Sequence, residues 1–272
     1  MTGRGDTLAE WREFARKAEA LGYATLVLPD HFARQLAPIP ALTAAAQASS
    51  TLRLGTLVLD NDFRHPASLA KELATLDLLS EGRLEIGIGT GSQPRDNEQA
   101  GLALDPPGVR YERLAETLTI LDACFANDQV NFDGKHYQLH EFMSYPRPVQ
   151  RRVPLMLGAR GPRMLRLAGR RADIIGVMGG AEANHAEQLA IVRAAAGDRF
   201  DSIEVNQLYL HVSIDSHSSG LPGFRGPALS GSRDQVAEQL VELRERELVS
   251  YVVVIGTAID AFAPIVARLS GT

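Results

Sequence analysis

The chain has 272 residues, of which 45% are hydrophobic, and its 28 basic and 33 acidic residues give a net charge of −5 at pH 7. This balance, without a basic cluster, excludes a protein that neutralises a nucleic-acid backbone or an anionic membrane surface. One cysteine excludes an internal disulfide, and no apolar run reaches the roughly 18 residues of a membrane-spanning helix. The first residues lack the apolar core of a signal peptide, so we expect a cytoplasmic protein with a single domain over residues 1–272.

Helical patterns alternate with short apolar runs along the whole chain. Trp11, Phe14 and Ala18 recur at helical spacing in the first segment, and Gly22 follows it as a stop signal. The predicted helices, in chain order, are residues 7–22, 38–50, 65–82, 109–126, 162–171, 182–197, 233–247 and 259–269. The predicted strands are residues 24–29, 52–59, 83–88, 154–158, 173–178, 203–213 and 250–256.

Strands that alternate with helices and are apolar throughout predict a parallel sheet that is buried on both faces. The fold class is therefore α/β, and the length favours a TIM-type (β/α)8 barrel of about 250 residues. Such a barrel has eight strands and the predicted ones begin after a helix, so we expect an initial strand of about eight residues upstream of Thr7. Residues 130–139 predict a hairpin that turns at Asp133–Gly134, and residues 217–232, rich in Gly, Ser and Pro, predict a loop.

The strand ends carry the candidate chemistry, because a parallel barrel places its active site where strands end and loops begin. His31 is the only histidine that directly follows an apolar strand, and an imidazole donates or accepts a proton near neutral pH. We therefore expect His31 to be catalytic. Asp30 beside it is a second catalytic candidate, with an orienting role or a turn cap as the alternatives.

Two glycine-rich strand ends indicate ligand contacts. Residues 87–92, GIGTGS, match a dinucleotide-binding motif only weakly, because Pro94 and a polar stretch without a helical period follow. Glycines at this place would instead let a flat ligand approach the strand end closely. Residues 158–164, GARGPRM, precede a predicted helix whose free N–H groups, with Arg160 and Arg163, predict a phosphate site; an ordinary turn is the alternative.

The histidines do not form a metal-binding pattern. His136 and His140 are four residues apart but fall in the predicted hairpin, and no carboxylate completes a set, so we expect no metal site. The sequence also has no G-x-S-x-G nucleophile elbow. Cys124 lies within a predicted helix, where we expect a buried apolar residue rather than a nucleophile.

Several of these stretches, in order, resemble the luciferase-like flavin and deazaflavin oxidoreductase family. The matching blocks are residues 18–32, 52–91, 134–139, 154–179 and 231–254. An aspartate and a histidine after the apolar strand, here Asp30 and His31, are typical of the branch that uses the deazaflavin coenzyme F420 rather than FMN. The resemblance implies a TIM-type barrel, often a homodimer, that binds the coenzyme and a small-molecule substrate in its mouth.

The resemblance also implies where the coenzyme binds. A non-proline cis peptide would lie at Leu57–Val58, and His31 would lie near the reactive carbon of the ring. The other implied cofactor-binding residues are Asp60 and Asn61 at the polar edge of the ring, Gly89, Gly91 and Asn97 along the next wall, Gly158, Ala159, Arg160 and Gly161 around the phosphate, and Met178 and Gly179 beside it.

Two departures from the family pattern bear on the substrate. The sugar-phosphate dehydrogenases of this family have a catalytic glutamate where this chain has Ser92, and no lysine follows residues 178–180 to hold a substrate phosphate. A sugar phosphate is therefore disfavoured. We expect an F420-dependent oxidoreductase that transfers a hydride to or from a small organic molecule. The alternatives are an FMN-dependent monooxygenase that uses oxygen and a barrel that binds a flavin or another small ligand without turnover.

Overall fold

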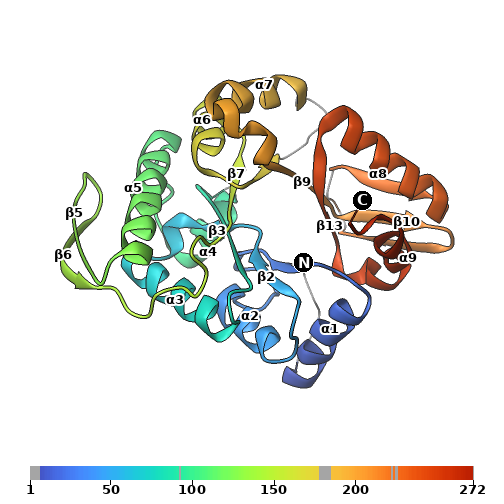
Figure 1. The fold of residues 1–272 in the computed structure, drawn as a ribbon, viewed down its shortest axis with the longest axis horizontal. Helices are drawn as coiled ribbons and strands as arrows, with labels where there is room; N and C mark the ends of the chain where they lie inside the picture. The colour runs from blue at the N-terminus through green and yellow to red at the C-terminus, as the bar shows by residue number, and fades with distance from the viewer. Residues whose placement is uncertain (1–6, 92, 178–184, 222, 224–225, 272) are drawn as a thin grey trace.

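The computed structural model describes residues 7–91, 93–177, 185–221, 223 and 226–271, and its centre is a curled parallel sheet (Figure 1). The strands of this sheet are hydrogen-bonded in the order β1 (Thr25–Leu28), β2 (Arg53–Thr56), β4 (Leu84–Gly89), β7 (Leu155–Ala159), β8 (Ile174–Val177), β9 (Glu204–Tyr209) and β13 (Val249–Val254). The short strand β3 (Leu59–Asp60) also pairs with β4. All of these pairings are parallel, so the carboxyl ends of the strands lie at one rim of the sheet.

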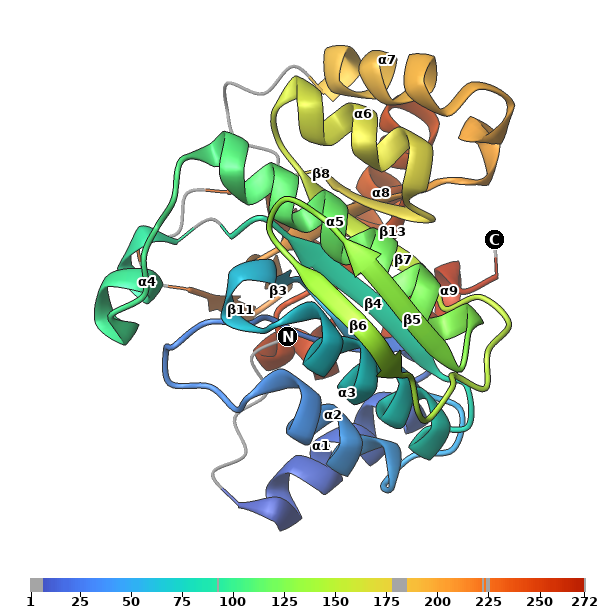
Figure 2. The ribbon, with the colours of Figure 1, turned by 90° about the vertical axis from the view of Figure 1, so that its left-hand side faces the viewer.

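Helices cover the outside of the curled sheet (Figures 1 and 2). They are α1 (Leu8–Ala20), α2 (Pro38–Ala46), α3 (Pro66–Leu79), α4 (Pro94–Ala100), α5 (Pro107–Ala126), α6 (Pro162–Arg171), α7 (His185–Ala196), α8 (Arg233–Glu247) and α9 (Ile259–Leu269), with short 3-10 helices η1 (Asn61–Phe63), η2 (Gly197–Ser202) and η3 (Gly256–Ala258). Every strand and helix predicted after Thr7 has a counterpart here. The predicted α/β class with a parallel sheet is therefore confirmed.

The end strands of the described sheet are β1 and β13. Side chains connect β13 to β4 and β2 across the inside of the curl. The Tyr251 hydroxyl of β13 donates a hydrogen bond to Glu85 Oε2 of β4 at 2.7 Å, and Arg53 of β2 forms an ion pair with the same carboxylate. These residues lie in the first half of their strands, so the polar cluster sits at the end opposite the rim. The strand expected upstream of Thr7 lies outside the described residues.

Residues 52–59, predicted as one strand, form β2 and β3 with a break between them. The break contains the cis peptide bond between Leu57 and Val58, at the place that the family resemblance implied. Thr56 bridges the gap, because its Oγ1 donates to the Gly87 carbonyl at 2.7 Å and accepts from the Gly87 N–H at 2.9 Å. A side chain thus replaces the main-chain ladder where β2 turns away from β4.

A second, smaller sheet lies beside the end of β9, and two sequence predictions were wrong here. Its strands are β10 (His211–Ile214), β11 (His217–Gly220) and β12 (Ala228–Gly231). Residues 203–213 are therefore not one strand, and residues 217–232 are not only a loop. The cause is the length of β13: Val254, its last residue, is the partner of Tyr209, so the chain beyond β9 pairs with other strands. Val212 and Ile214 of β10 are buried in the core beneath this sheet.

Helix α4 forms in the polar stretch 93–101, where the sequence shows no apolar period. Pro94 occupies its first turn, and Gly101 ends it in the left-handed conformation with φ of 68°. Proline at the start and glycine just past the end are the positions that these residues favour in helices. The start and stop signals, rather than periodicity, therefore mark this helix.

The predicted hairpin is confirmed by β5 (Gln129–Asp133) and β6 (Gln138–Met143), which lie over α5 in Figure 2. Its turn is closed by a hydrogen bond from the Gly134 N–H to the Tyr137 carbonyl at 2.9 Å. Cys124 of α5 is 0% exposed, as predicted for a buried apolar residue. His136 of the turn pairs with Glu112 Oε2 at 3.1 Å.

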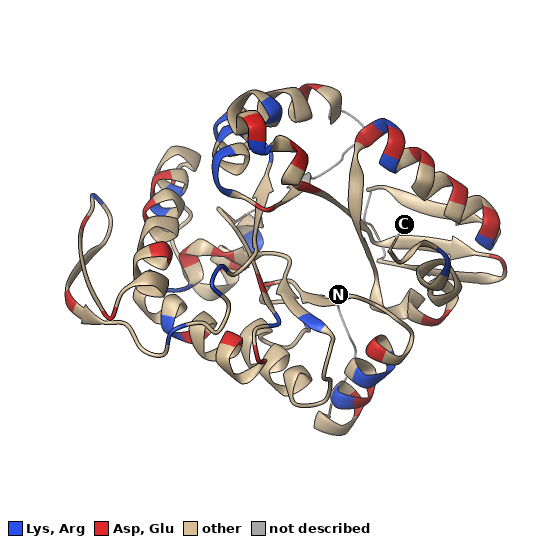
Figure 3. Cartoon of the chain, in the orientation of Figure 1, with Lys and Arg blue, Asp and Glu red and all other residues tan. Residues whose placement is uncertain are grey.

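The main core lies between the sheet and its helices, and a second apolar cluster joins β10, β12, α8 and α9. Trp11 anchors α1 to α2, because it is 2% exposed and its Nε1–H donates to the Ala41 carbonyl at 2.7 Å. Charged residues of both signs are mixed along the outer helices (Figure 3). In the part of the chain that the structure describes, no helix has the length and apolar character needed to cross a membrane.

Candidate active site

Asp30 and His31 follow β1 at the rim where the strands end, as predicted, but their surroundings differ. The His31 side chain is 38% exposed. The Asp30 side chain is 7% exposed: Arg64 Nη1 and Nη2 donate to its two oxygens at 2.6 and 3.1 Å, and the Asp60 N–H donates at 3.1 Å. Burial disfavours the charged form of Arg64, but the pair with Asp30 outweighs it, so the pKa of Arg64 is raised. Asp30 therefore ties β1 to the segment after β3 and offers little surface to a substrate.

Asp96 of α4 is the direct partner of His31, and the sequence analysis missed it. Its Oδ2 lies 2.7 Å from His31 Nδ1, and its Oδ1 accepts the Phe32 N–H at 3.3 Å. Helix α4 thus brings a carboxylate to the end of β1 from 65 residues further along the chain. The sequence feature that could have indicated this helix is the pair Pro94 and Gly101, which mark its start and end, with Asp96 in the first turn.

Glycines of two strands form a surface around Val58. A Cβ at Gly89 would lie 3.1 Å from Val58 Cγ2, and one at Gly158 would lie 3.4 Å from it. A Cβ at Gly87 would lie only 1.9 Å from the Thr56 carbonyl oxygen, which no side chain could tolerate. The cis peptide segment and the strands β4 and β7 therefore meet in a close-packed surface with few side chains. A flat ring can approach such a surface closely.

Asp60 and Gly91, two predicted contact residues, touch each other beside this surface. A Cβ at Gly91 would lie 2.3 Å from Asp60 Oδ2, and Gly91 has a φ of 77°. Arg110 fixes this turn by donating to the Gly91 carbonyl at 2.8 Å. Burial raises the pKa of Asp60, and repulsion from Asp62 and Asp30 adds to the rise. A hydrogen-bond donor or a cation beside Asp60 would therefore stabilise its charged form.

Asn61 and Asn97, also predicted to face the ligand, lie inside the protein instead. Asn61 is 1% exposed, and its Nδ2 donates to Asp62 Oδ1 at 3.1 Å. Asn97 is 4% exposed, and its Nδ2 donates to the Ala103 carbonyl at 3.4 Å. Both side chains brace the segments that carry the rim, and neither offers a ligand an accessible surface in this conformation.

The predicted phosphate site, Gly158 to Gly161, connects β7 to α6. Gly161 caps α6 without a side-chain hydrogen bond, and Pro162 occupies the first turn, so the following N–H groups are available to an anion. Arg160 is exposed, whereas Ala159 is 1% exposed and can contribute only main-chain atoms. The guanidinium of Arg163 lies 4.3 Å from the centre of the Tyr111 ring.

Three residues of the sequence prediction cannot be placed. Met178 and Gly179, expected beside the phosphate, lie outside the described residues, as does Ser92. An aromatic pair that was not predicted does adjoin the site: Phe32 is 52% exposed, and its ring lies 4.7 Å from that of Phe63. Phe32 follows His31 directly, so an apolar wall stands beside the imidazole.

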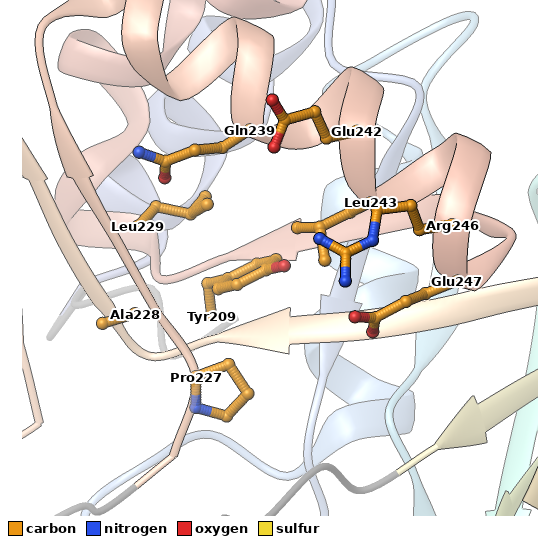
Figure 4. Close-up of a pocket in the computed structure, with 9 residues that line it drawn as sticks. All are labelled: Tyr209, Pro227, Ala228, Leu229, Gln239, Glu242, Leu243, Arg246 and Glu247. Carbon is orange, nitrogen blue, oxygen red and sulfur yellow. The ribbon is translucent and has the colours of Figure 1, made fainter. Parts of the chain in front are cut away.

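A separate pocket of about 310 Å³ lies between α8, β9 and β12 (Figure 4). Burial and the charge of Glu247 raise the pKa of Tyr209, one of its lining residues, to about 12. Arg246 and Glu242 also line it, so its charge favours no single class of ligand. Across the described ranges, no group of three histidine, cysteine or carboxylate side chains is placed to hold a metal ion.

Comparisons with known proteins find relatives in sequence and in fold. An F420-dependent glucose-6-phosphate dehydrogenase of Microbacterium testaceum is 34% identical over 172 residues, which are 60% of this chain and 51% of that protein. The chain thus spans about half the length of the curated relatives it matches. A solved F420-dependent tetrahydromethanopterin reductase from Methanopyrus kandleri has a TM-score of 0.83 at 21% identity, covering 97% of this chain and 96% of that chain.

A solved monooxygenase from Streptomyces bottropensis has a TM-score of 0.78 at 18% identity, covering 97% of this chain and 94% of that chain. At such identities the two structures show a shared fold. The sequence profile described as luciferase-like monooxygenase matches residues 1–219, which is most of the chain. With the strand order, the interrupted second strand and the matching profile taken together, the chain belongs to the luciferase-like monooxygenase family.

Proposed function

We propose that this protein is an oxidoreductase that uses coenzyme F420 and transfers a hydride between the coenzyme and a small organic molecule. The observation that carries the proposal is an exposed imidazole, held by a carboxylate, at the same rim as a glycine-lined surface. The curated relatives, named as F420-dependent enzymes, support the choice of coenzyme. The bound deazaflavin would supply or accept the hydride at its C5 carbon.

The rim residues fit such a coenzyme. Gly89 and Gly158 carry no side chains where they lie beside Val58, which gives a ring one flat face to lie on. Asp60 would face the polar edge of the ring, where a hydrogen-bond donor would favour its charged form. The start of α6 and the exposed Arg160 would hold the phosphate.

His31 is the proton-transfer group in this proposal. Hydride transfer to a carbonyl carbon needs a proton at the carbonyl oxygen, and the reverse reaction must remove one from an alcohol. The His31 ring has one nitrogen engaged by Asp96, which leaves the other for this proton. Asp30 and Arg64 have an indirect role in this proposal. Their ion pair holds the loop that carries His31 against the segment after β3.

The substrate that we propose is a small, neutral alcohol or carbonyl compound. Phe32 and Phe63 place an apolar wall beside the imidazole. Two nearby cations are already engaged, because Arg64 is paired with Asp30 and Arg110 donates to main-chain carbonyls. A neutral substrate therefore fits better than a phosphorylated one. Because the curated relatives are named as glucose-6-phosphate dehydrogenases, glucose 6-phosphate is the compound to assay beside the neutral substrates.

The second candidate is an FMN-dependent monooxygenase that uses oxygen. The family description and the structurally similar monooxygenase support it. A third candidate, of another class, is a barrel that binds a flavin or small ligand without turnover. Ser92, where the sugar-phosphate dehydrogenases of the family have a glutamate, supports this third candidate.

Equilibrium titration with coenzyme F420 and with FMN, under identical conditions, tests the proposal. We expect micromolar binding of F420 and FMN binding at least about tenfold weaker, a difference of about 1.4 kcal/mol. Tight binding of FMN without F420 binding would favour the monooxygenase instead. If F420 binds but neither alcohols nor carbonyl compounds are turned over, the non-catalytic barrel is favoured.

A matched pair of variants locates the phosphate. Arg160→Ala removes the exposed cation next to the α6 N-terminus, and we expect F420 to bind about tenfold more weakly, as for a lost charge-assisted hydrogen bond. Arg166→Ala removes an exposed arginine within the same helix, and F420 affinity should stay unchanged. Equal effects of the two changes would place the phosphate elsewhere.

A homodimer in the cytoplasm is also part of this proposal. The family resemblance favours the homodimer, and two exposed leucines near the end of α3, Leu78 and Leu79 (44% and 46% exposed), give apolar surface for a partner copy. Light scattering on the purified protein measures the mass directly, and a mass of one chain at micromolar concentration would contradict the dimer.

A further inference from the structure

The two carboxylate oxygens of Asp96 form hydrogen bonds with two consecutive residues in the loop after β1. Oδ2 lies 2.7 Å from His31 Nδ1, and Oδ1 accepts the Phe32 N–H at 3.3 Å. The Asp96 side chain is 12% exposed while that of His31 is 38% exposed, so the pair has a shielded side and an open side. The open side is that of the imidazole.

We propose that Asp96 is the positioning residue of the active site: it holds the proton of His31 on Nδ1 and so presents Nε2 to the substrate. A carboxylate only accepts hydrogen bonds, so a neutral His31 beside it carries its hydrogen on Nδ1. Nε2 then has a free lone pair, and no described residue forms a hydrogen bond with it. This inference deepens the proposed function and depends on it for its kinetic consequence only.

The main chain around α4 is built to hold Asp96 in place. The Leu102 N–H donates to the Asn97 carbonyl at 2.9 Å, and Asn97 Nδ2 reaches the Ala103 carbonyl, so the end of the helix is folded back on itself. Before the helix, Arg110 of α5 donates to the carbonyls of Thr90 and Gly91 at 2.7 and 2.8 Å. The segment before α4 is therefore fixed to α5, and the segment after it is folded back onto the end of the helix.

Asp96 matters because this chain has no acid at position 92. The glutamate that the family's sugar-phosphate dehydrogenases have there is a serine in this chain. Asp96 does not take over that role, because its two oxygens face the His31 and Phe32 atoms. The chain instead uses its nearby acid to fix the tautomer of the histidine, as the aspartate of a Ser-His-Asp triad does. His31 alone then exchanges a proton with the substrate.

The tautomer of His31 can be measured without coenzyme or substrate. Two-dimensional NMR of protein labelled with ¹⁵N in its histidine rings distinguishes Nδ1–H from Nε2–H. At a pH where the ring is neutral, we expect His31 of the unaltered protein to be in the Nδ1–H form. In Asp96→Ala, we expect a shift to the Nε2–H form that free imidazole side chains prefer. An unchanged His31 spectrum in Asp96→Ala would overturn the inference.

Two further variants separate positioning from folding. Glu98→Gln removes an exposed acid from the same helix and should leave the His31 signals unchanged. Asp96→Asn keeps the shape of the side chain, but its amide can donate as well as accept, so the Nδ1–H form should lose its exclusive population. If Asp96→Asn retains only the Nδ1–H form, the charge of Asp96 is not what sets the tautomer, and the inference is wrong.

The kinetic consequence is a loss of turnover without a loss of coenzyme binding. We expect Asp96→Ala to lower kcat about tenfold to a hundredfold, with the Kd for F420 unchanged within about twofold. Combined with His31→Ala, it should add nothing, because the two residues act as a unit. A full additional loss in the double variant would contradict the inference. If F420 fails to bind the unaltered protein, the proposed function fails, and the NMR result still decides the tautomer.

Discussion

The two ends of the curled sheet carry similar groups in opposite settings. At the rim, His31 and Asp96 come from a loop and a seven-residue helix, and the imidazole is 38% exposed. At the other end, Arg53, Glu85 and Tyr251 all come from strands, and the Glu85 side chain is only 8% exposed. Ion pairs fixed by strands contribute to folding, whereas groups on loops stay accessible and can react. The comparison therefore predicts activity defects at one end and stability defects at the other.

His31→Ala should have the largest effect, on activity alone. Loss of the proton-transfer group should lower kcat with F420 about 10²-fold to 10⁴-fold. Because the side chain is exposed, the melting temperature should change by no more than about 2 °C. Steady-state kinetics and calorimetry measure the two quantities. A loss of less than about threefold in kcat would remove His31 from the mechanism.

Glu85→Gln should have the opposite outcome. It leaves Arg53 without its carboxylate and Tyr251 without a charged acceptor, and the pKa of Tyr251 is already raised by burial and by Glu85. We expect a loss of about 2 kcal/mol in the free energy of unfolding, less than the roughly 3–5 kcal/mol of a fully buried pair, because the Arg53 side chain is 34% exposed.

Urea denaturation measures this loss, and kcat per folded molecule should be unchanged. Glu13→Gln is the matched control, since Glu13 is in an exposed pair with Arg16 and should change stability by less than about 0.5 kcal/mol. A large fall in kcat with stability retained would mean that the polar cluster opposite the rim takes part in catalysis.

Asp30→Asn tests a residue that lies at the rim but whose side chain is as buried as that of Glu85. It replaces the carboxylate that Arg64 holds with two hydrogen bonds, and we expect a loss of about 1–2 kcal/mol in stability. Glu72→Gln removes a more distant partner of the same arginine, at 3.8 Å, and should have little effect. Equal losses in the two variants would show that the bidentate geometry is unimportant.

Asp60→Asn should have the smallest effect, and its size depends on pH. Because the pKa of Asp60 is raised by burial, the folded protein binds this proton more tightly than the unfolded chain does. The ionised carboxyl therefore reduces stability at neutral pH, and this penalty disappears as the pH falls through the raised pKa. We expect Asp60→Asn to be more stable than the unaltered protein at pH 7, by of the order of 0.5 kcal/mol.

Urea denaturation at pH 7 and below pH 4 measures this difference, which should vanish at the lower pH. If the unaltered protein is the more stable one at pH 7, Asp60 gains from being charged, and its place beside Asp30 and Asp62 has been misjudged.

The sequence predicted what depends on pattern and missed what depends on a meeting of distant segments. The alternation of apolar strands with helices was enough for the parallel sheet, and the block that resembles a known family was enough for the cis peptide at Leu57–Val58. Asp96 was missed because its helix is polar throughout and meets His31 only through the fold. Asn61 and Asn97 were expected to face the ligand, but the residue type does not reveal that the Asp62 carboxylate holds the amide of Asn61 or that the Ala103 carbonyl holds that of Asn97 inside the protein.

A crystal structure of the protein with bound coenzyme F420 tests the central claim most directly. We expect the deazaflavin ring to lie against Val58 and the glycines of β4 and β7, with His31 Nε2 facing its reactive carbon and the phosphate at the start of α6. A coenzyme bound elsewhere, for instance in the pocket between α8 and β12, or a His31 ring turned so that Nδ1 faces the ligand, would contradict it.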